Sequence, residues 1–311
     1  MEQGSDLFSS ELEALIKDLK EDYENWTRGT PERYVFDLLV RRAETAVVDY
    51  WEEILEIIAM NIDFSKDVEL RFDMLSLVEH LLLQENLHST MIFYTEIMIK
   101  LVLLPCFEWR PSQPVAKIRK ASVICMMKLL EKRLIEKEKF AVLLPEIINK
   151  LKSPLDDDWG HDLRFAAVVL LHRMLEFMGG DMEREGFQEI YPELLKRLDD
   201  AQDGIRVETC KAFEVFFEHV PDPWSSSLYS YTIKQIFIHI DDPNTQIQNA
   251  ITSLLQKGCT VQTEDFIEIA RENETKFQHA LLVKNCLDFA IEVRNKRIAE
   301  SVQSAAAAAA Q

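Results

Sequence analysis

The chain has 311 residues, of which 47% are hydrophobic and 29% charged, so it can bury a sizeable core and is not expected to be disordered. Its 8 glycines and 10 prolines are few for this length, which argues against a β-rich fold that needs many turns. The net charge of −19 argues against nucleic-acid binding and against anionic membrane surfaces, because both attract clustered basic residues.

Two helices are predicted at the N-terminus, in "SSELEALIKDLKEDYENW" and "TPERYVFDLLVRRAETAVV". Ser9 or Ser10 can cap the first helix, and acidic residues follow in its first turn. We interpret residues 1–49 as a helix pair that caps one end of a larger array. No signal peptide and no run of 18 apolar residues is recognised, so no membrane span is predicted.

Three later segments repeat one pattern, with apolar residues on a single helical face. They are "DLRFAAVVLLHRMLEFM", "GIRVETCKAFEVFFEHV" and "QIQNAITSLLQKG", the last of which is predicted to stop at Gly258. A shorter apolar helix and an acidic turn precede each one. The unit is therefore helix A, acidic turn, helix B.

The repeat has a measurable period. Arg164 to Arg206 is 42 residues, Arg206 to Gln248 is another 42, and two weaker upstream copies place Arg71 and Arg119 in the same role. Helix–turn–helix periods near this length are typical of HEAT and armadillo arrays. We therefore predict an all-α fold, an α-solenoid (alpha-alpha superhelix) of HEAT/armadillo-like helix pairs.

The predicted organisation is one array over residues 1–300. About five repeats occupy 50–258, and 259–300 form C-terminal cap helices that close the array. Residues 301–311 are a low-complexity tail to which no function is assigned.

The five cysteines are odd in number, none lies close to another, and each falls in or beside an apolar helical stretch. This pattern predicts reduced, buried thiols in the cytosol or nucleus. The cysteines are Cys106, Cys125, Cys210, Cys259 and Cys286.

The stretch "YPELLKRLDDAQDGIRV" resembles the HEAT-repeat pattern, with a proline in helix A, an aspartate in the turn and an arginine in helix B. In that family the aspartates and arginines of neighbouring repeats form a ladder. A carboxylate there can accept free amide hydrogens of helix B and a bond from a guanidinium. The predicted ladder residues, which are structural, are Asp158, Arg164, Asp200, Arg206, Asp242, Gln248, Arg71 and Arg119.

A narrower resemblance covers residues 140–294. The phrase "YPELLKRLDD" is followed one repeat later by "HIDDPNTQIQNAI", in the same register. This order resembles the C-terminal repeats of the HEAT-repeat dynein axonemal assembly factor family. That resemblance implies a cytoplasmic scaffold for preassembly of axonemal dynein arms, with dynein chains and chaperone machinery as partners.

No motif of a catalytic, nucleotide-binding or metal site is recognised, so we predict a non-enzyme without cofactor, metal or small-molecule substrate. Trp109 and Trp159 both fall in turns between helices A and B, which lie along one edge of a solenoid. With Lys117, Arg119 and Lys120 they form a candidate partner-binding edge. The alternative, that each tryptophan folds back onto its own helix pair, stays open.

Uneven charge leaves a second function open. Residues 117–139 carry eight basic and three acidic side chains, whereas 181–203 carry eight acidic and three basic ones. A tubulin-binding module of the HEAT/TOG type, or a phosphatase or transport scaffold, is the alternative to dynein-arm assembly. The net negative charge counts against tubulin, which is itself acidic.

Overall fold

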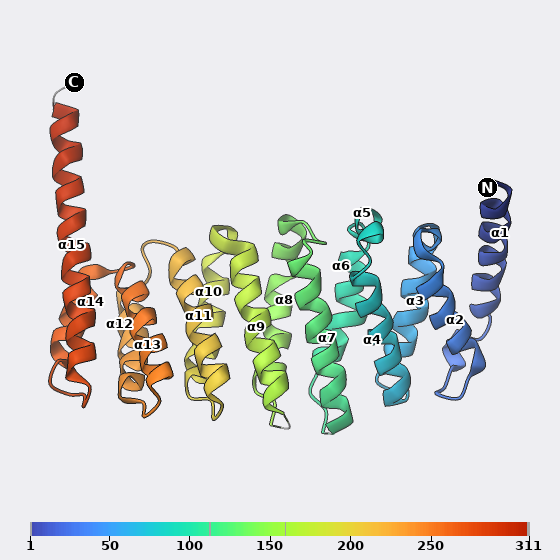
Figure 1. Cartoon of the computed structure of the whole chain (residues 1–311), viewed down its shortest axis with the longest axis horizontal. Coiled ribbons are helices and arrows are strands. Elements are labelled where there is room, and N and C mark those ends of the chain that lie inside the picture. The colour runs from blue at the N-terminus through green and yellow to red at the C-terminus, as the bar shows by residue number, and fades with distance from the viewer. Residues whose placement is uncertain (1, 112, 159, 310–311) are drawn as a thin grey trace. The chain divides into compact units, whose positions relative to one another are not determined.

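The structure is a computed structural model that describes residues 2–111, 113–158 and 160–309. Every regular element in that part of the chain is a helix (Figure 1). The all-α prediction is therefore confirmed. The chain divides into two compact units, Met1–Arg173 and Met174–Gln311, and each is described by itself. The prediction of one array over residues 1–300 stays a prediction.

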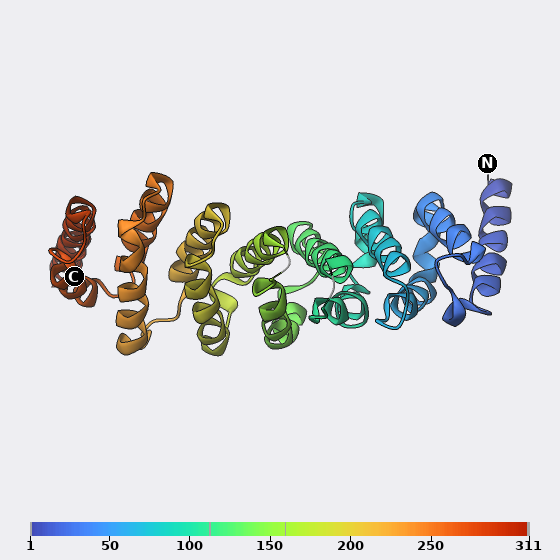
Figure 2. The ribbon, with the colours of Figure 1, turned by 90° about the horizontal axis from the view of Figure 1, so that it is seen from below.

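The first unit is built from helix pairs that follow one another in chain order (Figures 1 and 2). Its longer helices are α1 (Glu2–Leu19), α2 (Pro31–Arg42), α3 (Trp51–Ile62), α4 (Val68–Leu82), α7 (Gln113–Glu131), α8 (Lys137–Leu155) and α9 (His161–Met178), whose last turn belongs to the second unit.

One helix A of the first unit is irregular. Residues 95–107 run as the short helix α6 (Thr95–Met98), a π-helix η4 (Ile99–Leu103) and a 3₁₀ segment η5 (Leu104–Phe107). Pro105 lies at the start of η5 and cannot donate a backbone hydrogen bond, so a regular α-helical ladder cannot continue through it. Two further short helices, η3 (Glu85–Leu87) and α5 (His88–Met91), precede α6 and take up the extra length of this repeat.

The second unit continues with the same kind of pairs. Its helices are α10 (Arg184–Leu198), α11 (Asp203–His219), α12 (Ser226–Ile238), α13 (Thr245–Cys259), α14 (Thr263–Asn273) and α15 (Ala280–Ala309), with a short 3₁₀ segment η7 (His239–Asp241) before α13. Residue 301, where we predicted the tail to begin, lies inside α15. Alanine has the highest helix propensity, so the alanine-rich tail extends that helix to Ala309.

Aromatic side chains fill the core between α10 and α11. Phe216 of α11 meets Phe187 of α10 edge to face, with ring centroids 5.2 Å apart, and meets Trp224 at 5.9 Å. All three side chains are buried. The apolar face predicted for residues 204–220 is therefore the face that packs on the neighbouring helix A.

Gly258 lies inside α13, which ends one residue later at Cys259, so the prediction that the helix stops at this glycine is wrong. A Cβ atom at residue 258 would lie 2.9 Å from Ile233 of α12 and 3.1 Å from Phe217 of α11. The glycine therefore permits close approach of three helices, a role that one helix's sequence does not reveal.

Among the described residues no single helix is long and apolar enough to cross a bilayer, although one bent pair, Glu85–Met91 with Thr95–Phe107, passes on length and composition alone.

All five cysteines are free and buried, as predicted. Burial raises the pKa of Cys106 to about 11 and those of Cys210, Cys259 and Cys286 to about 12, and it also raises that of Cys125. A raised pKa leaves little thiolate at neutral pH, and the thiolate is the reactive form.

We therefore expect the native chain to react with an aromatic disulfide reagent at pH 8 about a hundredfold more slowly than a free thiol. Unfolding should release five reactive thiols. The variant Val142→Cys, at a position that is 77% exposed, is the control and should react at the ordinary rate. Fast reaction of the native chain would contradict the packing described above.

Candidate functional site

The same kind of hydrogen bond recurs in the turns between helices A and B: a side chain of helix B donates to a backbone carbonyl. A backbone carbonyl at the end of helix A or in the turn that follows it has no partner within the helix, and a side chain from helix B donates to it in five turns. These donors occupy the five positions that the repeat period places in one role. The bonds are Arg71 to the Ile62 carbonyl (2.8 Å), Arg119 to Arg110 (3.4 Å), Arg164 to Asp157 (2.9 Å), Arg206 to Leu198 (3.0 Å) and Gln248 to Asp242 (2.6 Å).

Arg119 and Arg206 each also reach an aspartate of the next repeat. Arg119 pairs with Asp157, and both side chains are fully buried. Arg206 pairs with Asp242, and these side chains are 15% and 9% exposed. The two pairs are charge-assisted hydrogen bonds in a dehydrated setting, where each partner depends on the other. They link consecutive repeats within each unit.

The structure corrects one predicted member of this ladder. Asp158 is exposed, whereas the preceding Asp157 is buried and holds Arg119. The second carboxylate oxygen of Asp157 accepts the backbone N–H of Gly160 at 3.1 Å. Asp157 therefore points inward, where it bonds both the backbone of its own turn and the arginine of the preceding repeat.

Asp200 and Asp242 serve their turns in the same way. Asp200 is buried and accepts the Gln202 N–H at 3.0 Å and the Arg197 guanidinium at 3.2 Å. Asp242 accepts the Asn244 N–H at 2.8 Å. These contacts form local turns in which a carboxylate bonds the backbone two residues on.

At position 248 a glutamine replaces the arginine of the other repeats, and it contacts a histidine in place of an aspartate. Its amide nitrogen lies 3.2 Å from Nε2 of His279, and Nδ1 of His279 lies 3.1 Å from a carboxylate oxygen of Asp241. Asp241 also accepts the backbone N–H groups of Gln278 and His279, both at 2.9 Å. This network joins the turn before α13 to the segment that leads into α15.

Only some residues of the predicted partner-binding edge are exposed in the structure. Trp109 is 48% exposed and Lys117 is exposed, but Lys120 pairs with Asp162 at 3.0 Å. Arg119 is buried in its ion pair and is therefore not part of an accessible surface, which corrects its assignment to this edge. Trp159 lies outside the described residues.

Two residues that the sequence analysis missed join this edge. The guanidinium of Arg110 lies 4.2 Å from the ring centroid of Phe64, whose side chain is 61% exposed. Arg110 directly follows Trp109, so the turns of two neighbouring repeats share a cation–π contact. The available signal was a phenylalanine in the otherwise polar turn "DFSKD".

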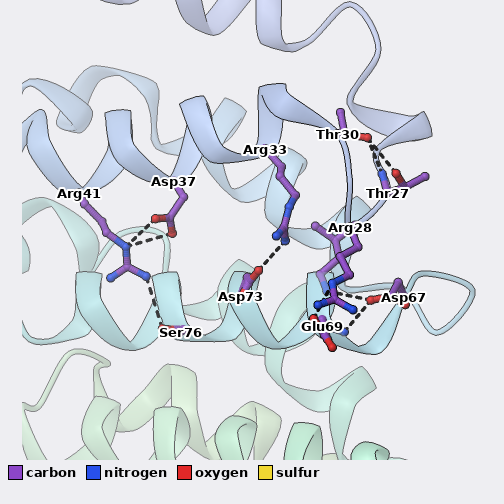
Figure 3. Close-up of polar contacts among 11 residues, drawn as sticks. Thr27, Arg28, Thr30, Arg33, Asp37, Arg41, Asp67, Glu69, Asp73 and Ser76 are labelled. Atoms are coloured by element: carbon purple, nitrogen blue, oxygen red, sulfur yellow. Dashed lines mark hydrogen bonds and ion pairs between the residues drawn. The ribbon is translucent and has the colours of Figure 1, made fainter.

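A polar contact set also joins α2 to α4 (Figure 3). Arg33 and Arg41 project from α2, where Arg33 pairs with Asp73 and Arg41 donates to Ser76 at 3.4 Å. Arg41 is held in place by Asp37 at 2.9 and 3.0 Å on its own helix. These bonds anchor the N-terminal pair on the first repeat.

Among the described residues, no group of three or more His, Cys, Asp or Glu side chains is placed to hold a metal ion.

No protein-family model matches the chain. The chain is 25% identical to human dynein axonemal assembly factor 5 over 261 residues, which is 81% of the chain and 30% of that protein. It is 24% identical to the mouse protein of the same name over 266 residues, 83% of the chain and 31% of that protein. The resemblance predicted from the two repeat phrases is confirmed. The chain spans less than a third of the length of these relatives.

Solved structures with a similar arrangement are helical repeat proteins. A computationally designed armadillo repeat protein matches 77% of the chain with a TM-score of 0.51 and 13% identity, and 99% of it is covered. An engineered protein from the Northeast Structural Genomics Consortium matches 78% with a TM-score of 0.50 and 12% identity, and 96% of it is covered. The predicted α-solenoid class is confirmed, and together with the curated relatives it supports a repeat-scaffold role.

The Arg206–Asp242 pair gives a pH-dependent prediction. Burial by itself would raise the pKa of Asp242, but the bonds from Arg206 and the Asn244 amide outweigh it, so the net pKa is lowered. A carboxyl with a lowered folded-state pKa stabilises the fold above its unfolded pKa of about 3.9, and this stability is lost as the pH falls through the folded value.

We expect Asp242→Asn to lower the unfolding free energy by about 2 kcal/mol at pH 7, because it removes the closest carboxylate from the half-buried Arg206 and leaves only the longer contact with Asp203 at 3.5 Å. The difference from wild type should shrink below about pH 4. Urea titrations at pH 7 and pH 3.5 measure it. Asp158→Asn, which alters an exposed carboxylate, is the matched control and should change stability by less than about 0.5 kcal/mol. Equal losses in the two variants would contradict the assigned register.

Proposed function

We propose that this chain is a non-catalytic scaffold that binds protein partners during the cytoplasmic preassembly of axonemal dynein arms. The observation that carries the proposal is the similarity to curated assembly factors over 81% of the chain. Dynein chains and chaperone machinery are the proposed partners.

Binding rather than catalysis is supported by the kind of fold. Repeat arrays present long surfaces that act by contact with other chains. The similar armadillo protein was designed for modular peptide recognition. We assign part of the binding to the edge formed by Phe64, Trp109, Arg110 and Lys117, where exposed aromatic rings lie beside cations. Aromatic and arginine side chains of this kind dominate the energy of many interfaces.

Tubulin binding is the alternative function, and it would use the same edge. The chain's charge of −19 works against association with an acidic partner. Co-sedimentation with microtubules at low salt separates the two functions, since electrostatic contacts are strongest there. A chain that enters the pellet under these conditions favours the alternative.

The assembly function predicts that axonemal dynein chains co-purify with the tagged chain from ciliated cells and lose abundance when the protein is depleted. The double variant Phe64→Ala, Trp109→Ala should reduce recovery by about tenfold or more, because two exposed hot-spot side chains are truncated. Tyr231→Ala, an exposed aromatic of the second unit, is the control and should leave recovery unchanged. If dynein chains neither co-purify nor lose abundance, the function is wrong.

A further inference from the structure

An apolar groove of about 690 Å³ lies in the first unit between α3 and the irregular helix at residues 95–107. Leu55 and Met60 line one wall, and Ile97 and Leu101 line the other. Met60, Ile97 and Leu101 are 37%, 43% and 55% exposed. Apolar side chains thus gather here outside the buried core, on the face made by two consecutive A helices.

The groove follows the direction of α3. Its lining runs from Glu52 through Leu55 and Met60 to Asp63, one stripe along the helix and just past its end. At about 1.5 Å of rise per residue this stripe is about 16 Å long, or three helical turns. A helix laid alongside α3 matches that length and would place its own stripe of residues between the two walls.

The irregular helix shapes the second wall. Leu101 lies in the π-helical segment Ile99–Leu103, which Pro105 follows shortly after. A π-helical turn is wider than an α-helical one, is rare, and occurs frequently at functional sites. Leu101, in this π-helical segment, lines the groove and is 55% exposed.

The rim of the groove is anionic. Its lining includes the carboxylates Glu52, Glu56 and Asp63, and none of the described residues that line it is a lysine or arginine. Glu56 accepts bonds from Lys20 (2.6 Å) and the Tyr23 hydroxyl (2.8 Å), which lower its pKa.

Asp63 accepts two bonds from Ser65, at 2.6 and 2.9 Å, and these lower its pKa. Both carboxyls therefore stay ionised at neutral pH. An apolar floor with an anionic rim complements a segment with apolar residues on one face and cations beside them.

We propose that this groove binds a helical segment of a protein partner in which lysine or arginine residues flank an apolar stripe. The inference rests on the proposed partner-binding function and specifies the chemistry of one partner segment. The apolar stripe lies between Met60 and Leu101, and the flanking cations meet Glu52 and Asp63 at the two ends of the groove.

The test uses the full chain and a fluorescent peptide of about 15 residues made only of leucine and lysine, with leucines on one helical face. We expect the wild-type chain to bind it by fluorescence anisotropy. Leu101→Asp and the double variant Glu52→Lys, Asp63→Lys should each weaken binding about tenfold or more, because one removes the apolar contact and the other reverses the rim charge.

The controls separate this groove from general attraction to an acidic chain. Val142→Asp alters an apolar residue that is 77% exposed on α8, and it should change binding by less than about threefold. A peptide in which glutamate replaces every lysine should not bind. The proposal is overturned if the wild type does not bind the leucine–lysine peptide, if Leu101→Asp binds it as wild type does, or if the glutamate peptide binds equally well. Circular dichroism checks that each variant is folded.

Capture from ciliated cells with wild type and Leu101→Asp distinguishes this inference from the function on which it rests. Dynein chains recovered equally by both would retain the scaffold function and remove the groove as their binding site. Specific binding of the peptide without any recovered dynein chain would retain the groove and remove the assembly function.

Discussion

The rest of the structure depends on how backbone carbonyls at the end of helix A, or in the turn that follows it, are paired. In five successive turns a side chain of helix B, an arginine in four and a glutamine in the fifth, donates the missing bond. The bond fixes the position of helix B relative to the end of helix A. Because an unpaired buried carbonyl is costly, this requirement keeps the donor at one place in every repeat.

The arginines that stack the repeats are not the residues that are exposed for binding. Arg119 and Arg206 are consumed by ion pairs with the next repeat and cannot meet a partner. Residues beside them remain accessible, as Trp109 and Phe64 are at one edge. The groove beside α3 is a separate surface, where apolar side chains of α3 and of the irregular helix at residues 95–107 stay exposed. Stacking and binding are therefore carried by different residues of the same repeats.

Sequence patterns located the donors but not all of their acceptors. The period placed Arg71, Arg119, Arg164, Arg206 and Gln248 in one role, because a helical repeat must return the same contact at the same interval. It selected Asp158 where the structure uses Asp157, since "LDDDW" offers several carboxylates and only the turn geometry decides which one points inward. The exposed Met60 and Leu101 were missed, because an apolar residue on a helix is ordinarily assigned to the core.

The sequence by itself determined the helical class, the paired repeats, the buried thiols and the likeness to dynein assembly factors, because periodicity and composition are properties of the chain alone. Tertiary structure decided which carboxylate pairs with which arginine, why Gly258 lies inside a helix and where apolar side chains stay exposed. Those features depend on the approach of helices that are distant in sequence or on a local break in helical geometry. The residue pattern of a single helix carries no information on either of these features.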